Sequence, residues 1–331
     1  MDHTPPTTTL VDASRAASRA DSSVHVLYIA GAGRSGSTLL SNVLGQLPGA
    51  VSVGELYYLW ERGLEDNSLC GCGTPVRQCA FWGRVLERAR QAAGVDDIGS
   101  ALRAGVAGAR TRHLLNMLTQ TGRHDFVARS QPFLHVLQHL YAAIRDETGC
   151  DYIIDASKFP TYGYLLTAVP TLSVSVIHLI RDARAVGFSW QRQKYNPDSD
   201  ALFGRISSLR SALIWDAWNL GAELLGRTLP AGRYYRLHYE TFIQRPDETL
   251  ADIIALGGLE ARPTDVIDDG MVTMRQAHTI GGNPVRFQRS MRLRLDTEWQ
   301  RAMPLAPRAL TTTLTWPLLR RYHYPLKGEP A

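Results

Sequence analysis

The stretch VHVLYIAGAGRSGSTLL, residues 24–40, decides the fold of this chain. Its first part, residues 24–30, is mostly apolar and predicts a buried β-strand. A loop of glycine and serine follows, and residues 39–47 (LLSNVLGQL) repeat apolar side chains at helical spacing. A strand, a glycine-rich loop and a helix in this order predict the start of a βαβ unit, in which loop amides and the helix N-terminus can hold a phosphate.

The rest of the chain continues the alternation of strands and helices. Apolar runs predict strands at residues 50–53, 152–154, 173–180 and 234–238, and helical patterns lie at 183–194, 206–229 and 248–256. Alternation of this kind predicts an α/β fold with a P-loop-like, doubly wound parallel sheet flanked by helices. In such sheets ligands bind at the carboxyl ends of the strands.

Composition and length set the domain organisation and exclude several classes of protein. The chain has 331 residues, 44% of them hydrophobic, and a net charge of +5, which is too small for a dedicated nucleic-acid binder. Residues 1–23 are rich in Thr, Ser, Ala and Pro and predict a disordered leader without a signal-peptide core. Residues 24–331 then form one domain, with residues 67–121 as an insertion. The longest apolar stretch, 164–180, is interrupted by Pro170, so we expect no membrane span and a cytoplasmic protein.

The glycine-rich loop has the frame of a P-loop without its lysine. Gly31-x4-Gly36-Ser37-Thr38 matches G-x-x-x-x-G-K-[ST] except that Ser37 stands at the lysine position, while Arg34 supplies a cation within the turn. A γ-phosphate bound with Mg²⁺ normally needs that lysine. Loop amides, two hydroxyls and Arg34 can hold a 5′-phosphosulfate, so the loop favours sulfuryl transfer over ATP chemistry.

The same loop resembles the 5′-phosphosulfate loop of the sulfotransferases that use 3′-phosphoadenosine-5′-phosphosulfate (PAPS). The chain looks like a bacterial type of this family and resembles its carbohydrate and tyrosylprotein branches in particular. Residues 176–189 (VIHLIRDARAVGFS) are similar to the 3′-phosphate block of that family, with Arg181 and, eight positions later, Ser189. Residues 235–250 (YRLHYETFIQRPDETL) resemble a third family segment and would place Tyr239 against the nucleotide.

The resemblance implies a donor, an acceptor and a set of site residues. The donor is PAPS, the product adenosine-3′,5′-bisphosphate, and the acceptor a hydroxyl of a carbohydrate or small natural product, bound partly by the insertion 67–121. Neither a metal nor a nucleic acid is implied. The donor residues implied in this way are Gly33, Arg34, Ser35, Gly36, Ser37, Thr38, Arg181, Ser189, Tyr239 and Arg286.

Three residues are candidates for catalysis. Glu55 follows the second predicted strand and matches the position of the catalytic glutamate in the tyrosylprotein enzymes, which predicts a general base. Lys158, behind the third strand, matches the family lysine and is predicted to face the bridging oxygen of the leaving phosphate together with Arg34. The alternatives are a structural ion pair for Glu55 and a solvated loop position for Lys158. Tyr57, Tyr58 and Trp60 predict either an aromatic wall for the acceptor or a part of the core.

The cysteines and histidines give a weaker signal. Cys70, Cys72 and Cys79 form a C-x-C-x6-C cluster, but no histidine or fourth cysteine lies nearby in the sequence, so free thiols or one disulfide are expected in place of a metal site. His278 lies in the loop of Arg286, which the family folds over the 3′-phosphate, and has only a possible role there.

Two other classes of function stay open. In a P-loop kinase or nucleotidase, Asp155 would end a strand as a magnesium ligand, but the missing lysine argues against this reading. A nucleotide-binding scaffold of the same fold would need no base, which makes the presence of both Glu55 and Lys158 hard to explain.

Overall fold

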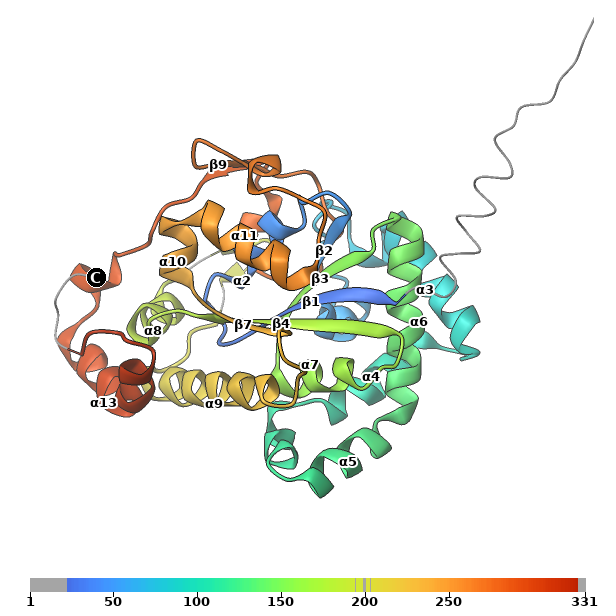
Figure 1. Cartoon of the computed structure of the whole chain (residues 1–331), viewed down its shortest axis with the longest axis horizontal. Coiled ribbons are helices and arrows are strands. Elements are labelled where there is room, and N and C mark those ends of the chain that lie inside the picture. Colours follow the sequence, from blue (N-terminus) through green and yellow to red (C-terminus); the bar gives the residue numbers. More distant parts are fainter. Residues whose placement is uncertain (1–22, 194, 199–200, 203, 327–331) are drawn as a thin grey trace, which may run out of the picture.

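A parallel sheet of five strands forms the centre of the protein (Figure 1). The structure is a computed structural model that describes residues 23–193, 195–198, 201–202 and 204–326. The strands are, in spatial order, β2 (Ala50–Gly54), β3 (Tyr152–Lys158), β1 (Val24–Ala30), β4 (Leu172–Ile180) and β7 (Tyr234–His238). All four pairings are parallel, which confirms the predicted doubly wound α/β fold. The predicted leader falls almost wholly on residues 1–22, outside the described residues.

Helices cover both faces of this sheet because β1 is apolar on both sides. Val24, Val26 and Tyr28 pack into one core cluster, whereas Leu27 and Ile29 pack into another. Successive side chains of a strand point to opposite faces, so a continuous apolar run needs cover on both of them. The sequence of β1 therefore dictates a three-layer arrangement.

Different helices cover the two faces of the sheet. One face carries α3 (Ala80–Ala93), α4 (Ile98–Gly108), α6 (Gln131–Thr148), α7 (Pro160–Thr167) and α9 (Ser208–Gly226), and the other carries α2 (Ser37–Leu44), α10 (Tyr239–Gln244) and α11 (Pro246–Gly257). The C-terminal α13 (Leu305–Arg321) packs beside α8 (Ala183–Gln191) and α9 (Figure 1). The insertion 67–121 builds α3 and α4, which lie against α6.

Shorter helices and strands lie around these layers, besides the 3-10 helices η1 (Leu56–Tyr58), η3 (Val76–Gln78), η4 (Thr111–Met117), η5 (Pro263–Asp265) and η6 (Pro284–Phe287) and the π-helix η2 (Leu59–Glu65). These shorter helices and strands are α5 (Gln120–Arg129), α12 (Trp299–Ala302), the hairpin of β5 (Tyr195–Asn196) and β6 (Ala201–Leu202), and the small sheet of β8 (Ile267–Asp268), β9 (Met271–Thr273) and β10 (Ser290–Arg292). In the part of the chain that is described, no helix combines the length and apolarity that a membrane crossing requires.

Most predicted elements lie where the sequence places them, and the differences occur at their ends. Helix α9 starts at Ser208 because the Ser207 side chain accepts the backbone N–H of Arg210 as an N-cap. Helix α8 ends at Gln191, and Arg192 takes an extended conformation that lets its side chain pair with Glu298. These ends depend on capping and pairing that hydrophobic periodicity does not report.

A segment far along the chain extends the sheet beside β2. Ile280 forms an isolated parallel bridge with Gly54. Its N–H donates to Val53 O at 2.9 Å, and its carbonyl accepts the N–H of Glu55 at 2.7 Å. Residues 277–283, which we call the covering segment, thus lie next to the carboxyl end of β2.

Candidate functional site

The loop between β1 and α2 has the backbone of a phosphate-binding turn. Gly31 and Gly36 have φ values of 131° and 95°, which L side chains rarely adopt. A Cβ atom on Gly36 would lie 2.5 Å from the ring of Tyr239. Helix α2 starts directly after Gly36, so its first free amides point towards the space in front of the loop.

Two of the predicted catalytic residues have an unusual backbone conformation. Arg34 and Lys158 have φ values of 67° and 73°, in the left-handed region that side chains other than glycine seldom occupy. Such conformations persist where the surrounding structure enforces them, and they gather at functional sites. Both residues also line the same cavity.

Glu55 and Lys158 form a buried ion pair at the ends of β2 and β3. Lys158 Nζ lies 2.7 Å from Glu55 Oε1, and the Arg62 guanidinium lies 3.4 Å from Glu55 Oε2. Burial alone raises the pKa of the Glu55 carboxyl, but Lys158 and Arg62 outweigh it, so that the pKa lies below its ordinary value. Burial lowers the pKa of the Lys158 amine, and the charge of Glu55 opposes this shift. The structure brings these two predicted residues together.

Arg181 occupies the carboxyl end of β4, on the other side of the loop. Its guanidinium donates to the Arg34 carbonyl at 3.3 Å and pairs with the Asp296 carboxylate at 3.3 Å. It also lies over the ring of Tyr239, 4.6 Å from the centroid. Arg181, Tyr239 and Arg34 are therefore held as one group around the loop.

The last turn of α8 places Ser189 and Trp190 against the same loop. Ser189 is buried and lines the cavity. The guanidinium of Arg34 lies over the ring of Trp190 at 4.7 Å from the centroid. This stacking fixes the side chain of Arg34 in front of the loop.

A cavity of about 630 Å³ joins these groups, within the range of roughly 300–1000 Å³ typical of small-molecule sites. Its described wall carries two carboxylates, Glu55 and Asp296, and several cations. The cations are Arg34, Arg62, Lys158, Arg181, Arg205 and Arg210. The excess of positive charge suits a ligand with several anionic groups.

The covering segment forms a part of the wall next to the start of α2. Gly282 and Asn283 line the cavity, and the Asn283 amide donates to Thr38 Oγ1 at 3.1 Å. Arg286 lies behind them, bound to the carbonyl of Leu69 and to the carboxylate of Asp198, and it is not among the described residues of the cavity wall.

Further predicted residues differ in how they meet the cavity. The Ser35 side chain is buried, does not line the cavity, and has no hydrogen-bond partner among the described residues. Tyr58 lines the cavity, whereas Tyr57 is buried and stacks on Phe159 with 4.1 Å between the ring centroids. Trp60 lies outside the cavity wall. Aromatic side chains near Glu55 thus divide between wall and core.

The insertion reaches the cavity only indirectly. The described residues of the cavity wall include none from 67–121. One of its contacts with the covering segment is made by Gly71, whose N–H donates to the Thr279 carbonyl at 2.9 Å.

Sequence reasoning missed Arg62, Trp190 and Asp296. Arg62 lies in the helical turn after Glu55 and stacks on Tyr58 at 3.9 Å as well as pairing with Glu55. A cation seven positions after the predicted base is the one local signal for it. Nothing near Asp296 in the sequence indicates that it meets Arg181.

Asp155 does not occupy the position of a magnesium ligand. Its side chain is fully buried, accepts the hydroxyls of Tyr141 and Ser157, and does not line the cavity. Burial raises the pKa of the Asp155 carboxyl to about 6. The geometry therefore removes the main support for kinase chemistry.

The expectation that the cysteine cluster lacks a fourth metal ligand is wrong. His278 is far from Cys70, Cys72 and Cys79 in the sequence, but the covering segment brings its ring to the three sulfur atoms. Parallel pairing beside β2 causes this approach, and no local sequence pattern reports it.

Comparisons with known proteins agree with this geometry. A family described as "Sulfotransferase family" matches residues 27–263. The sulfotransferase domain from the Synechococcus PCC 7002 olefin synthase superposes with a TM-score of 0.52 at 20% identity, over 92% of this chain and 97% of that one. The sulfotransferase domain from the curacin biosynthetic pathway gives 0.51 at 16% identity, over 92% and 99%. These two structures share the fold. Comparison with curated proteins gave no match.

Proposed function

Because this chain belongs to the sulfotransferase family, we propose that it moves the sulfuryl group of PAPS to an acceptor hydroxyl and releases adenosine-3′,5′-bisphosphate. One observation carries the proposal. A phosphate-binding loop and the Glu55–Lys158 pair face the same cavity, whose described wall holds more cations than carboxylates.

The donor would lie along the loop and towards Arg181. Amides at the start of α2, the hydroxyls of Ser37 and Thr38, and the Arg34 guanidinium suit the 5′-phosphosulfate. Arg181 and Ser189, at the end of β4 and on α8, suit the 3′-phosphate. The ring of Tyr239 would then contact the nucleotide between the two phosphate positions.

The transfer is an in-line displacement at sulfur. The acceptor oxygen forms a bond to sulfur while its proton moves to Glu55. The bond between sulfur and the bridging oxygen breaks, and its electron pair stays on the 5′-phosphate. Lys158 and Arg34 stabilise the charge that develops on this leaving group.

The ion pair couples these two events. In the resting state Glu55 neutralises Lys158 across 2.7 Å. When Glu55 takes the proton, its own negative charge disappears, and the full charge of Lys158 becomes available to the leaving oxygen. Electrostatic stabilisation is then larger in the transition state than in the ground state, which is the condition for catalysis.

The charge environment also determines the protonation state of the base. Lys158 and Arg62 keep the pKa of Glu55 below its ordinary value, so the carboxylate is ionised at neutral pH. A low pKa weakens a base, and the acidity that the acceptor hydroxyl gains as its bond to sulfur forms compensates for this.

The acceptor is proposed to be a carbohydrate or a small natural product. Tyr58 and Trp218 line the cavity near Glu55 and offer flat apolar surface to a sugar or aryl ring. The contribution of residues 67–121 to the acceptor site stays a prediction, as do the role of Arg286 at the nucleotide and the cytoplasmic location.

Thermal unfolding separates this proposal from nucleotide kinase chemistry. Adenosine-3′,5′-bisphosphate without magnesium should raise the Tm, because a ligand that binds only the folded state stabilises it. Stabilisation by ATP with Mg²⁺ and none by the bisphosphate would overturn the proposal. Transfer of radiolabel from PAPS to a panel of sugars, phenols and natural products then identifies the acceptor.

A further inference from the structure

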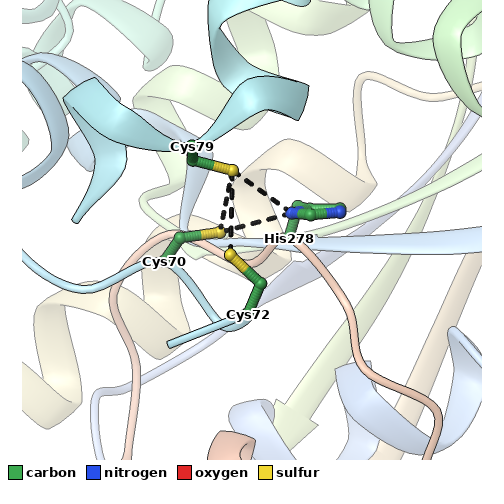
Figure 2. Close-up of side chains that lie close together, drawn as sticks. All are labelled: Cys70, Cys72, Cys79 and His278. Atoms are coloured by element: carbon green, nitrogen blue, oxygen red, sulfur yellow. Dashed lines mark hydrogen bonds between the residues drawn. The ribbon is translucent and has the colours of Figure 1, made fainter. Parts of the chain in front are cut away.

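Three cysteines and one histidine lie close together between the insertion and the covering segment (Figure 2). Cys70, Cys72 and Cys79 come from the loop that precedes α3, and His278 belongs to the covering segment. The three sulfur atoms and the ring nitrogen all lie within 4.8 Å of one another. Cys70 and Cys79 are buried, while Cys72 and His278 are partly exposed.

Four of the six distances between these ligand atoms match the edges of a tetrahedron around one metal ion, and the other two are within 4.8 Å. Zinc bonds of about 2.3 Å to sulfur place two sulfur atoms about 3.8 Å apart, and a bond of about 2.05 Å to nitrogen places it about 3.6 Å from each sulfur. Cys72 and Cys70 both lie 3.8 Å from Cys79, sulfur to sulfur. His278 Nδ1 lies 3.6 Å from the Cys70 sulfur and 3.3 Å from the Cys79 sulfur.

The same distances argue against a disulfide in this arrangement. A disulfide joins its sulfur atoms at about 2.05 Å, and all four cysteines are free. Neutral thiols make only weak hydrogen bonds. Such bonds alone do not explain why three thiols surround an imidazole that belongs to a distant segment of the chain.

We propose that Cys70, Cys72, Cys79 and His278 bind one structural zinc ion. Three thiolates and one imidazole are a common structural ligand set for zinc. Four protein ligands leave no open position, so this ion holds the fold together and takes no part in the reaction. The short C-x-C spacing departs from the usual C-x2-4-C.

The surroundings of the cluster support this assignment. Phe81 stacks on the His278 ring with 4.5 Å between centroids and 10° between planes, which fixes the orientation of the imidazole.

Gly71 shows how closely the two segments approach. A Cβ atom at this position would lie 2.3 Å from Thr279 Oγ1 and 2.4 Å from the Ala277 carbonyl. The glycine between Cys70 and Cys72 therefore lets the covering segment pass against the loop, which brings His278 into reach.

The metal would connect the insertion to the wall of the cavity. His278 lies two residues before Ile280, which pairs with β2 next to Glu55, and the same segment continues to Asn283 on Thr38. Zinc binding at His278 would fix the N-terminal part of the covering segment in place.

Metal analysis of the full chain, purified under reducing conditions without added chelator, tests the proposal. We expect about one zinc ion per chain, and removal by 1,10-phenanthroline should lower the Tm by about 5 °C or more. Protein that holds no zinc after expression with added zinc, or that holds iron or copper in its place, would overturn the assignment.

Substitutions identify the ligands. Cys72→Ser and His278→Ala should lose the zinc, while His278→Cys should keep it because four thiolates also bind zinc. Cys150→Ser is the matched control, since Cys150 lies outside the cluster, and it should retain one zinc. Equal zinc content in Cys72→Ser and Cys150→Ser would contradict the ligand set.

Replacing zinc by cobalt in the wild-type chain tests the ligand set without any substitution, so the result does not depend on whether a variant folds. Replacement of zinc by Co²⁺ should give intense thiolate-to-metal charge-transfer absorption and the visible bands of a tetrahedral site. An octahedral cobalt spectrum would exclude a site made of three thiolates and one imidazole. These measurements need no nucleotide, so their outcome is independent of the proposed activity.

Discussion

The cavity has an ion pair at each side, and the two pairs differ in their access to water. Glu55 and Lys158 have side-chain exposures of 10% and 8% and lie 2.7 Å apart. In the other pair, Arg181 is 8% exposed but Asp296 is 37% exposed, at 3.3 Å. Attraction between charges is stronger where water is excluded, so the first pair is held firmly and the second can exchange partners.

This difference separates the chemistry from the binding. In the proposed mechanism, proton transfer to Glu55 removes the negative charge of the buried pair and leaves Lys158 positively charged, whereas the pair with one exposed partner releases Arg181 to the phosphate of the donor. We therefore expect substitutions at the Glu55 end to affect kcat and substitutions at the Arg181 end to affect the affinity for the donor.

The largest effect is expected from Glu55→Gln. Loss of a general base costs about 10²–10⁴ in rate, so kcat should fall by at least about a hundredfold. The Tm rise caused by adenosine-3′,5′-bisphosphate should stay unchanged, because the loop and Arg181 are intact. Near-normal turnover in this variant would remove Glu55 from the mechanism.

Lys158→Ala should reduce kcat by about 10²–10³, the loss typical of one electrostatic donor. It also leaves the Glu55 carboxylate buried with Arg62 alone, so the free energy of unfolding should fall by about 3 kcal/mol. Turnover and urea unfolding measure the two effects. Arg245→Ala, which breaks an exposed pair with Glu248, is the control and should change neither.

Arg181→Ala should raise the KM for the donor about 10- to 100-fold, since hydrogen bonds to a charged group contribute about 1.5–3 kcal/mol. The change in kcat should be much smaller than in Lys158→Ala. Initial rates at varied PAPS concentration separate the two constants. An equal loss of kcat in both variants would show that catalysis and donor binding are not separated between the two ends of the cavity.

The acid limb of the pH profile gives a further comparison. Lys158 and Arg62 hold the pKa of Glu55 below its ordinary value of 4.5, so kcat/KM should stay flat as the pH falls from 8 to about 5 and drop roughly tenfold per unit below that pKa. The contribution of this ion pair to the free energy of unfolding depends on pH in the same direction. It is present above pH 4.5 and is lost as the pH falls through the lowered pKa of Glu55. An acid limb near pH 6.5 would indicate a different base.

Asp296→Asn should give the smallest effect, with the opposite sign. Removing the partner of Arg181 frees its guanidinium, so the bisphosphate should bind about threefold more tightly, in line with the modest energy of a half-exposed pair. Isothermal titration calorimetry measures the affinity. Weaker binding would mean that Asp296 orients Arg181 for the phosphate.

Local sequence patterns predicted the sheet and the glycine-rich loop, because a strand, a glycine turn and a helix can each be recognised from a few consecutive residues. Glu55, Lys158 and Arg181 could be placed because they directly follow strands whose ends meet at one edge of a parallel sheet. All three residues line one cavity, and their catalytic and binding roles stay predictions.

Contacts between distant segments could not be predicted in this way. Asp296 reaches Arg181, and His278 reaches Cys70, through packing that leaves no periodic signal in the sequence. The same limit explains Arg286, whose side chain pairs with Asp198 and is not among the described residues of the cavity wall.

The bridge between Ile280 and Gly54 has a consequence for solubility. β2 is the outermost strand of the sheet on its side, and an uncovered outer strand presents free amides and carbonyls to other chains. Ile280 binds two of these groups, at Val53 and Glu55, at the end of the strand nearest the cavity. Detachment of the covering segment would therefore expose, beside Glu55, a template for aggregation with other chains.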